Sequence, residues 1–190
     1  MNAEFLGNFL EDKLISSHIA AVKGSYTEKA ALECRNMADS YLLDGRTFFT
    51  SGDDVNAVAS FTYALGWIDA GRYIGFIEPD NRYFNESGDE IFITPGLDEH
   101  LNEKTGRYKR MLTSALDSVK SGPDIESPVY NASEGIIRKA GNHLNSGDEF
   151  LNRKMTVNAL AEYSYGYGWL DCGVRAGIII ILKNRELFTV

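Results

Sequence analysis

Hydrophobic residues recur at helical spacing along most of the chain. In residues 5–22 the apolar positions return every three or four residues, which predicts one buried face of an amphipathic helix. That face would carry Phe5, Phe9, Leu10, Leu14, Ile15 and Ile19. Two further helices are expected over about 28–50 and about 54–77. The last of these is apolar nearly all round, which predicts a helix buried between neighbours.

The same pattern occurs twice in the chain. Aligned without gaps, residues 38–77 and 140–179 are identical at 15 of 40 positions, which indicates an internal duplication. The most similar stretch is ALGWIDAG at 64–71, which returns as GYGWLDCG at 166–173. The duplicated part of the chain covers the second and third expected helices of each copy.

These patterns predict an all-α protein made of two similar three-helix modules, residues 1–96 and 97–190, each with a short terminal β piece. The β pieces would be EIFIT (90–94) and ELFTV (186–190), which are short, β-branched and aromatic. A third helix that is apolar all round needs more cover than two short helices supply. We therefore expect the modules to pack face to face, imitating a dimer.

The second and third helices of each copy also match the spacing of a tetratricopeptide hairpin. Gly45-x2-Phe48 followed by Ala57-x3-Phe61 stands where that repeat places its small and aromatic packing residues. Asp69 occupies the place of the repeat's usual proline, so the third helix is expected to continue. Because the two hairpins are not in tandem, an ordinary solenoid is not expected.

The segment MADSYLLDGRTFFTSGDDVNAVASFTYALGWIDAG resembles the signature of an archaeal family, domain of unknown function 357. Members carry a small helical module ending in Tyr-Ala-x-Gly-Trp-Leu-Asp-x-Gly, which residues 63–71 match well. The second copy departs from this pattern, because Gly166 and Cys172 stand where the pattern has alanine. The resemblance implies an archaeal, cytoplasmic, helical protein and supplies no activity.

Composition narrows the classes of partner. The net charge of −8 argues against general binding to nucleic acid or to an anionic membrane. No apolar run approaches the roughly 20 residues of a membrane span, and no basic signal-peptide region precedes the first helix. Cys34 and Cys172 do not make a disulfide framework, so we expect a cytoplasmic location.

The repeated Trp-x-Asp-x-Gly element has two interpretations. In the structural one, Trp67 and Trp169 anchor the core, and Asp69 and Asp171 pair with nearby arginines on the same helix. Those arginines would be Arg72 and Arg175, and a stripe of Gly66, Gly71 and Gly75 would let another helix approach closely. In the functional one, both aspartates converge across a pseudo-twofold axis on a metal or a shared cleft. Two carboxylates without histidine or glutamate make a poor metal site, so we expect the structural role and no metal or cofactor.

A second candidate site is Arg138 with His143. Arg-x4-His on a helix resembles the catalytic signature of the HEPN ribonucleases, in which the two residues act by charge stabilisation and acid–base chemistry. The first copy has Asn36 and Tyr41 at the aligned places, which argues against a shared catalytic role.

The sequence carries no phosphate-binding loop, nucleophile elbow or zinc-protease motif. We therefore expect a non-catalytic binding or scaffolding protein that presents a helical groove to a protein or peptide partner. An oligomer is the other assembly we consider, beside pairing of the two modules within one chain. The acidic balance of the first half favours a basic partner. The alternatives are a ribonuclease using Arg138 and His143, or a metal-dependent enzyme at the cleft between the modules.

Overall fold

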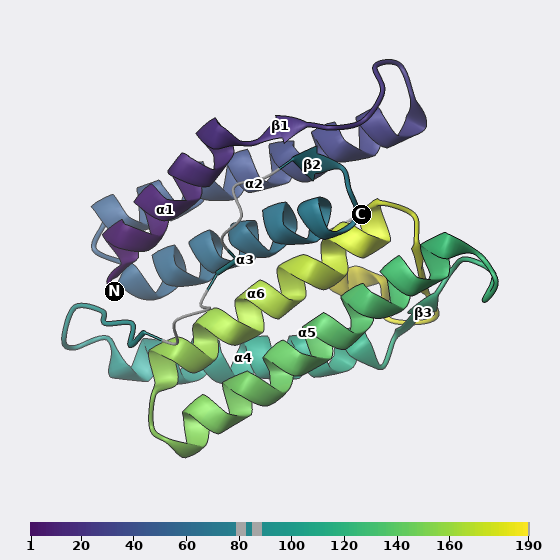
Figure 1. The fold of residues 1–190 in the computed structure, drawn as a ribbon. Helices are drawn as coiled ribbons and strands as arrows, with labels where there is room; N and C mark the ends of the chain where they lie inside the picture. Colours follow the sequence, from purple (N-terminus) through teal and green to yellow (C-terminus); the bar gives the residue numbers. More distant parts are fainter. Residues whose placement is uncertain (79–82, 85–88, 190) are drawn as a thin grey trace.

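The computed structural model describes residues 1–78, 83–84 and 89–189. Its architecture is helical, as predicted, and the helices fall into two sets of three (Figure 1). Their bounds are α1 Ala3–Ser16, α2 Tyr26–Thr50, α3 Asp54–Tyr73, α4 Asp98–Leu116, α5 Pro128–Asn152 and α6 Thr156–Arg175. Among the described residues, no helix is both long and apolar enough to cross a membrane.

The two helix triplets repeat the same plan. Helices α2 and α5 are both 25 residues long, and α3 and α6 are both 20 residues long. Figure 1 shows α3 and α6 side by side in the middle of the molecule, with the remaining helices of each triplet outside them. The expected duplication of a three-helix module is confirmed. The boundary predicted at 96/97 falls directly ahead of α4 and stays a prediction.

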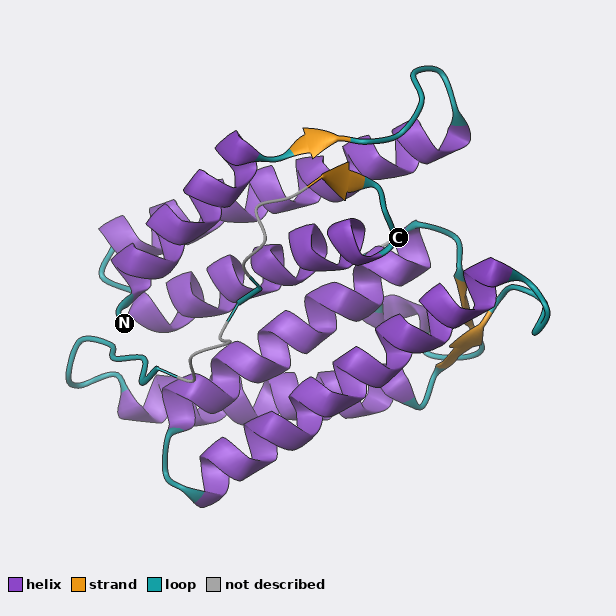
Figure 2. Cartoon of the chain, viewed as in Figure 1, coloured by secondary structure: helices purple, strands orange, loops and turns teal. Residues whose placement is uncertain are grey.

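Each triplet carries one small antiparallel sheet (Figure 2). In the first, β1 (His18–Ile19) pairs with β2 (Ile77–Glu78). In the second, β3 (Val119–Ser121) pairs with β4 (Ile179–Ile181). Each sheet therefore ties the chain after the first helix of its triplet to the chain after the third.

The strands do not lie where the sequence predicted them. Residue Phe92 of the 90–94 segment makes only an isolated parallel bridge to Asn2, and Arg185–Leu187 form a 3₁₀ turn. Val190 lies outside the described residues. Pairing occurs earlier in each copy because Gly75 and Gly177, at φ of 79° and 76°, turn the chain back as soon as α3 and α6 end.

The buried face of α1 also differs from the prediction. Phe5 is 50% exposed and Ile15 is 76% exposed, although both were expected in the core. The Asn2 side chain caps the helix by accepting a hydrogen bond from the Phe5 backbone N–H. The helix that begins at this cap buries a different face from the predicted one. The buried positions are Ala3, Leu6, Gly7, Leu10, Lys13 and Leu14.

Helices α3 and α6 cross at a pair of equivalent glycines. A Cβ on Gly66 would overlap the carbonyl oxygen of Tyr165, and a Cβ on Gly168 would overlap that of Tyr63. The predicted close approach is therefore confirmed at Gly66. It does not extend along a stripe, because Gly71 faces the Ile77 side chain and Gly75 lies beyond the end of α3.

Candidate functional site

Asp69 on α3 lies at the centre of a buried polar cluster. Its side chain is inaccessible to solvent, and the Lys13 Nζ of α1 lies 2.9 Å from its Oδ1. Its Oδ2 accepts hydrogen bonds from the Tyr165 hydroxyl at 2.8 Å and from the Phe84 backbone N–H at 3.2 Å. Three segments that are distant in sequence therefore meet on one carboxylate, including α6 of the other module.

Asp171 on α6 occupies the equivalent place in the second module. Its Oδ2 accepts hydrogen bonds from the Tyr63 hydroxyl at 2.5 Å and from the Thr189 hydroxyl at 2.9 Å. Unlike Asp69, it forms no ion pair with a basic side chain anywhere in the described part of the chain. One buried carboxylate thus has a counter-ion, and its twofold equivalent has only uncharged hydrogen-bond donors, namely two hydroxyls and the backbone of Thr189.

The expected pairing of each aspartate with an arginine of its own helix is wrong. The Arg72 guanidinium lies over the Tyr83 ring, 4.0 Å from its centroid. The Arg175 Nε donates instead to Glu33 of α2, at 2.8 Å. Both aspartates point into the interface between the modules, so groups on the facing helix reach them and their same-helix neighbours do not.

The two carboxylates have different electrostatic environments. Burial raises the pKa of Asp171 to about 6, although the hydroxyls of Tyr63 and Thr189 oppose this shift. Burial also raises the pKa of Asp69, and there the Lys13 charge is the largest opposing cause. The pKa of Tyr165 is raised well above its usual value by burial and by the neighbouring Asp69 charge. The tyrosines are therefore hydrogen-bond donors throughout the physiological pH range.

A functional role of the repeated Trp-x-Asp-x-Gly element would need an open cleft between Asp69 and Asp171. The helices that carry them instead cross in close contact, and neither aspartate lines either of the two cavities described below. In the described ranges 1–78, 83–84 and 89–189, no three histidine, cysteine, aspartate or glutamate residues are grouped to hold a metal ion. The contacts around the two aspartates favour a role as a joint between the modules.

The two tryptophans lie beside this polar cluster. Both are buried, and within the described residues their Nε1 atoms have no hydrogen-bond partner. Trp169 packs against Tyr165 and Tyr73, with ring centroids 6.2 Å and 5.6 Å away. The ammonium of Lys139 lies 5.1 Å from the Trp169 ring centroid. These contacts are consistent with the expected role of the tryptophans as core anchors.

Arg138 and His143 do not share a recess. Arg138 is exposed, and neither cavity described below is lined by either residue. The His143 Nδ1 lies 2.7 Å from the Glu162 carboxylate, and its ring meets the Tyr165 ring edge-on with centroids 4.6 Å apart. Its aligned residue Tyr41 packs against Tyr63 in the same way, at 4.5 Å. The positions of His143 and Tyr41 are therefore equivalent packing positions around the polar core.

Sequence reasoning missed several members of the polar cluster. Tyr63 and Tyr165 are identical in both copies, a signal that could have identified them as partners of the repeated aspartates. Lys13 offered no such signal, because a lysine on an amphipathic helix is normally exposed. Glu162 is aligned with Ser60 of the first copy, so identity between the copies could not identify it.

Two cavities bear on the function of the chain. The first, of about 370 Å³, is named the axial groove here because both modules line it with aligned residues. It is bounded by Tyr26, Thr27, Ile74, Phe76, Pro128, Val129, Ala132 and Ile178. The two modules therefore contribute equally to a recess that neither could form alone.

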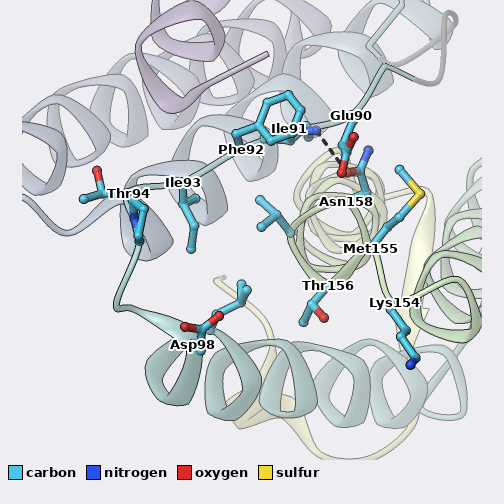
Figure 3. Close-up of a pocket in the computed structure, with 13 residues that line it drawn as sticks. Glu90, Ile91, Phe92, Ile93, Thr94, Asp98, Lys154, Met155, Thr156 and Asn158 are labelled. Atoms are coloured by element: carbon cyan, nitrogen blue, oxygen red, sulfur yellow. Dashed lines mark hydrogen bonds between the residues drawn. The ribbon is translucent and has the colours of Figure 1, made fainter.

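The second cavity, of about 270 Å³, lies between the 90–95 segment and the beginning of α6 (Figure 3). Asn158 fixes this segment, because its side chain accepts from the Ile91 N–H and donates to the Asp89 carbonyl, both at 3.0 Å. Asp54 holds the Thr94 backbone N–H at 2.7 Å. Asn158 and Asp54 thus anchor the connection between the modules beside this cavity.

One family model matches both helix triplets. The family described as "Protein of unknown function (DUF357)" matches residues 7–77 and again residues 107–179. The chain belongs to this family. Each match covers most of one helix triplet and ends at the first residue of its last strand, so the chain carries two tandem copies of the family's domain. No curated protein and no solved structure matches the chain.

Proposed function

We propose that the chain is a non-catalytic binding or scaffolding protein that holds an apolar segment of a partner protein in the axial groove. The observation that carries this proposal is the composition of the groove. Among the described residues, its lining contains no carboxylate, imidazole, amine or thiol. An open recess with an apolar lining is typical of a binding surface, and the only side-chain polar groups of this lining are the hydroxyls of Tyr26 and Thr27.

Aligned residues of both modules face each other across the groove. Tyr26 and Pro128 are aligned, as are Thr27 with Val129 and Phe76 with Ile178. The duplication therefore accounts for the groove, since the N-termini of α2 and α5 supply its two sides.

Apolar side chains at the rim of the axial groove are unusually exposed. Tyr26 is 68% exposed and Val129 is 44% exposed. A cluster of large apolar side chains around a recess marks an interaction surface, because a partner can remove them from water.

Selection of peptides from a random display library against the full chain tests this function. Selected peptides should be apolar and should bind with measurable affinity in fluorescence anisotropy. Val129→Glu places a charge in the groove, and an acidic side chain suits the first turn of a helix, so the fold should be retained. We expect it to weaken binding at least tenfold.

The matched control for this experiment is Leu43→Glu, at a 68% exposed position of α2 that does not line the groove. It should leave peptide binding unchanged. Failure to enrich any peptide, or peptides indifferent to Val129→Glu, would contradict the proposal. Light scattering on the same samples reports whether a second copy occupies the groove.

A ribonuclease activity is the second candidate, favoured by one observation. The carboxylate of Glu162 orients the His143 imidazole, as a base is oriented for proton transfer. Labelled RNA incubated with the wild-type chain should stay intact if the binding function is right. Cleavage that is lost in His143→Ala and kept in His100→Ala would replace the binding function by catalysis. The cytoplasmic location, the archaeal origin and the tetratricopeptide-like character of the hairpins stay predictions.

A further inference from the structure

Two buried cysteines meet across the interface between the modules. The Cys34 Sγ on α2 lies 3.1 Å from the Cys172 Sγ on α6, although the residues are 138 positions apart in sequence. Both side chains are wholly excluded from solvent. Their thiols are free in the structure and are near enough to share a proton.

The two cysteines are not repeated between the copies of the duplicated module. Cys34 is aligned with Ile136 of the second copy, and Cys172 is aligned with Ala70 of the first. The positions aligned with this pair therefore carry isoleucine and alanine in place of the two thiols. These are the only two cysteines of the chain, and both lie at the same contact.

The surrounding contacts hold α2 and α6 at this separation. One residue before Cys34, Glu33 accepts a hydrogen bond from the Arg175 Nε at 2.8 Å. The Tyr26 hydroxyl lies 3.5 Å from the Ala176 carbonyl oxygen, one turn beyond Cys172. Both contacts join the part of α2 that precedes Cys34 to the end of α6 that follows Cys172, so they hold the two helices together next to the sulfur atoms.

We propose that Cys34 and Cys172 form a disulfide that covalently joins the two modules. A low-molecular-weight disulfide is the oxidant: each cysteine sulfur loses its proton and the two sulfurs bond, while the oxidant's S–S bond breaks to give two thiols. The sulfurs need to approach by only about 1 Å to reach the bonding distance, a change that side-chain rotation supplies. The bond closes a long loop and so constrains the unfolded chain.

Burial sets the kinetics of this reaction. It raises the pKa of the Cys172 thiol well above its usual value, with Cys34 as the next cause. Because the thiolate is the attacking species, exchange in the closed native state is slow. The disulfide therefore forms as the chain folds or when α2 and α6 separate transiently.

Refolding of the full chain in a buffer of oxidised and reduced glutathione tests the proposal. After acid quenching and non-reducing trypsin digestion, mass spectrometry should find peptide 30–35 linked to peptide 155–175. The intact chain should lose the mass of two hydrogen atoms and remain monodisperse. Mixed disulfides with glutathione, intermolecular dimers, or two thiols that are both alkylated after denaturation would each overturn the proposal.

Thermal melts provide an independent measurement. The oxidised chain should melt roughly 4–16 °C above the reduced chain, given the usual stabilisation by a disulfide and the size of the protein. Cys172→Ala is the matched control, because it installs the residue that the first module carries at position 70. Its melting temperature should not respond to oxidant. An oxidised wild-type chain that melts at or below the reduced one would also overturn the proposal.

Discussion

The Tyr165 hydroxyl of α6 donates a 2.8 Å hydrogen bond to the Asp69 carboxylate of α3, across the interface between the two modules. Tyr63 and Asp171 make the reciprocal contact. Each module therefore supplies the donor that satisfies the buried carboxylate of the other. A buried polar group without such a partner is costly, so this exchange makes the two modules depend on each other.

Removal of one hydroxyl tests this dependence. Tyr165→Phe leaves the ring packing intact but deprives Asp69 of a donor, and we expect it to lower the free energy of unfolding by about 1–3 kcal/mol. Urea denaturation followed by circular dichroism measures the change. Tyr130→Phe is the control, because its hydroxyl has no hydrogen bond within the described residues and its loss should cost less than about 0.5 kcal/mol. Equal effects of the two variants would contradict the reciprocal joint.

Lys13 should be essential to the first module as a buried counter-ion. Lys13→Met removes the charge and keeps the length of the side chain, leaving Asp69 buried and uncompensated. We expect a loss of about 3–5 kcal/mol in unfolding free energy. The double variant Lys13→Met, Asp69→Asn should recover much of this loss, whereas Lys23→Met at an exposed position should be silent. A double variant no more stable than the single one would contradict the ion pair's role.

Asp171 should make stability depend on pH. Burial raises its folded-state pKa from 3.8 to about 6, so the folded chain binds a proton there that the unfolded chain releases. This contribution to stability is fully present below about pH 4 and is lost as the pH rises through 6, a decrease of about 3 kcal/mol. Denaturation at several pH values measures it.

The Asp171→Asn variant is the control for this pH dependence. The asparagine cannot ionise, so the stability of this variant should fall less over the same window than that of the wild-type chain, and its amide oxygen can still accept from Tyr63. Asp69→Asn should be far more costly at pH 7, because it leaves the Lys13 charge buried without a partner. Comparable losses in both variants would show that the two aspartates are electrostatically alike.

The close helix contact at Gly66 can be tested with two alanine substitutions that should change the stability of the chain in opposite directions. A Cβ at Gly66 overlaps the Tyr165 backbone, which cannot rotate away, so Gly66→Ala should cost about 1–3 kcal/mol or more. Gly141→Ala on α5 meets no atom within 4 Å and should stabilise the chain by about 0.5–1 kcal/mol. Melting curves distinguish the two, and stabilisation by Gly66→Ala would rule out the tight crossing.

Local patterns were sufficient for much of this fold. Helix α3 begins at Asp54, where an apolar run follows an aspartate, and α2 begins within two residues of the expected position. The duplication placed the same elements in the second half, because identity at a fixed offset is visible without any structure. The errors fell at the strands and on the outer helix α1, where pairing and capping outweighed local preference.

The sequence by itself determined the class of fold, the number of modules and the positions of the repeated aspartates, because these follow from periodicity and from the repeat. Only the tertiary structure decided what each aspartate contacts. Asp69 meets Lys13 from α1, and Asp171 meets Thr189 near the end of the chain. Such partners come from segments far apart in sequence, and their choice depends on which faces the packed helices bury. Near neighbours such as Arg72 are adjacent in sequence and are nevertheless directed elsewhere.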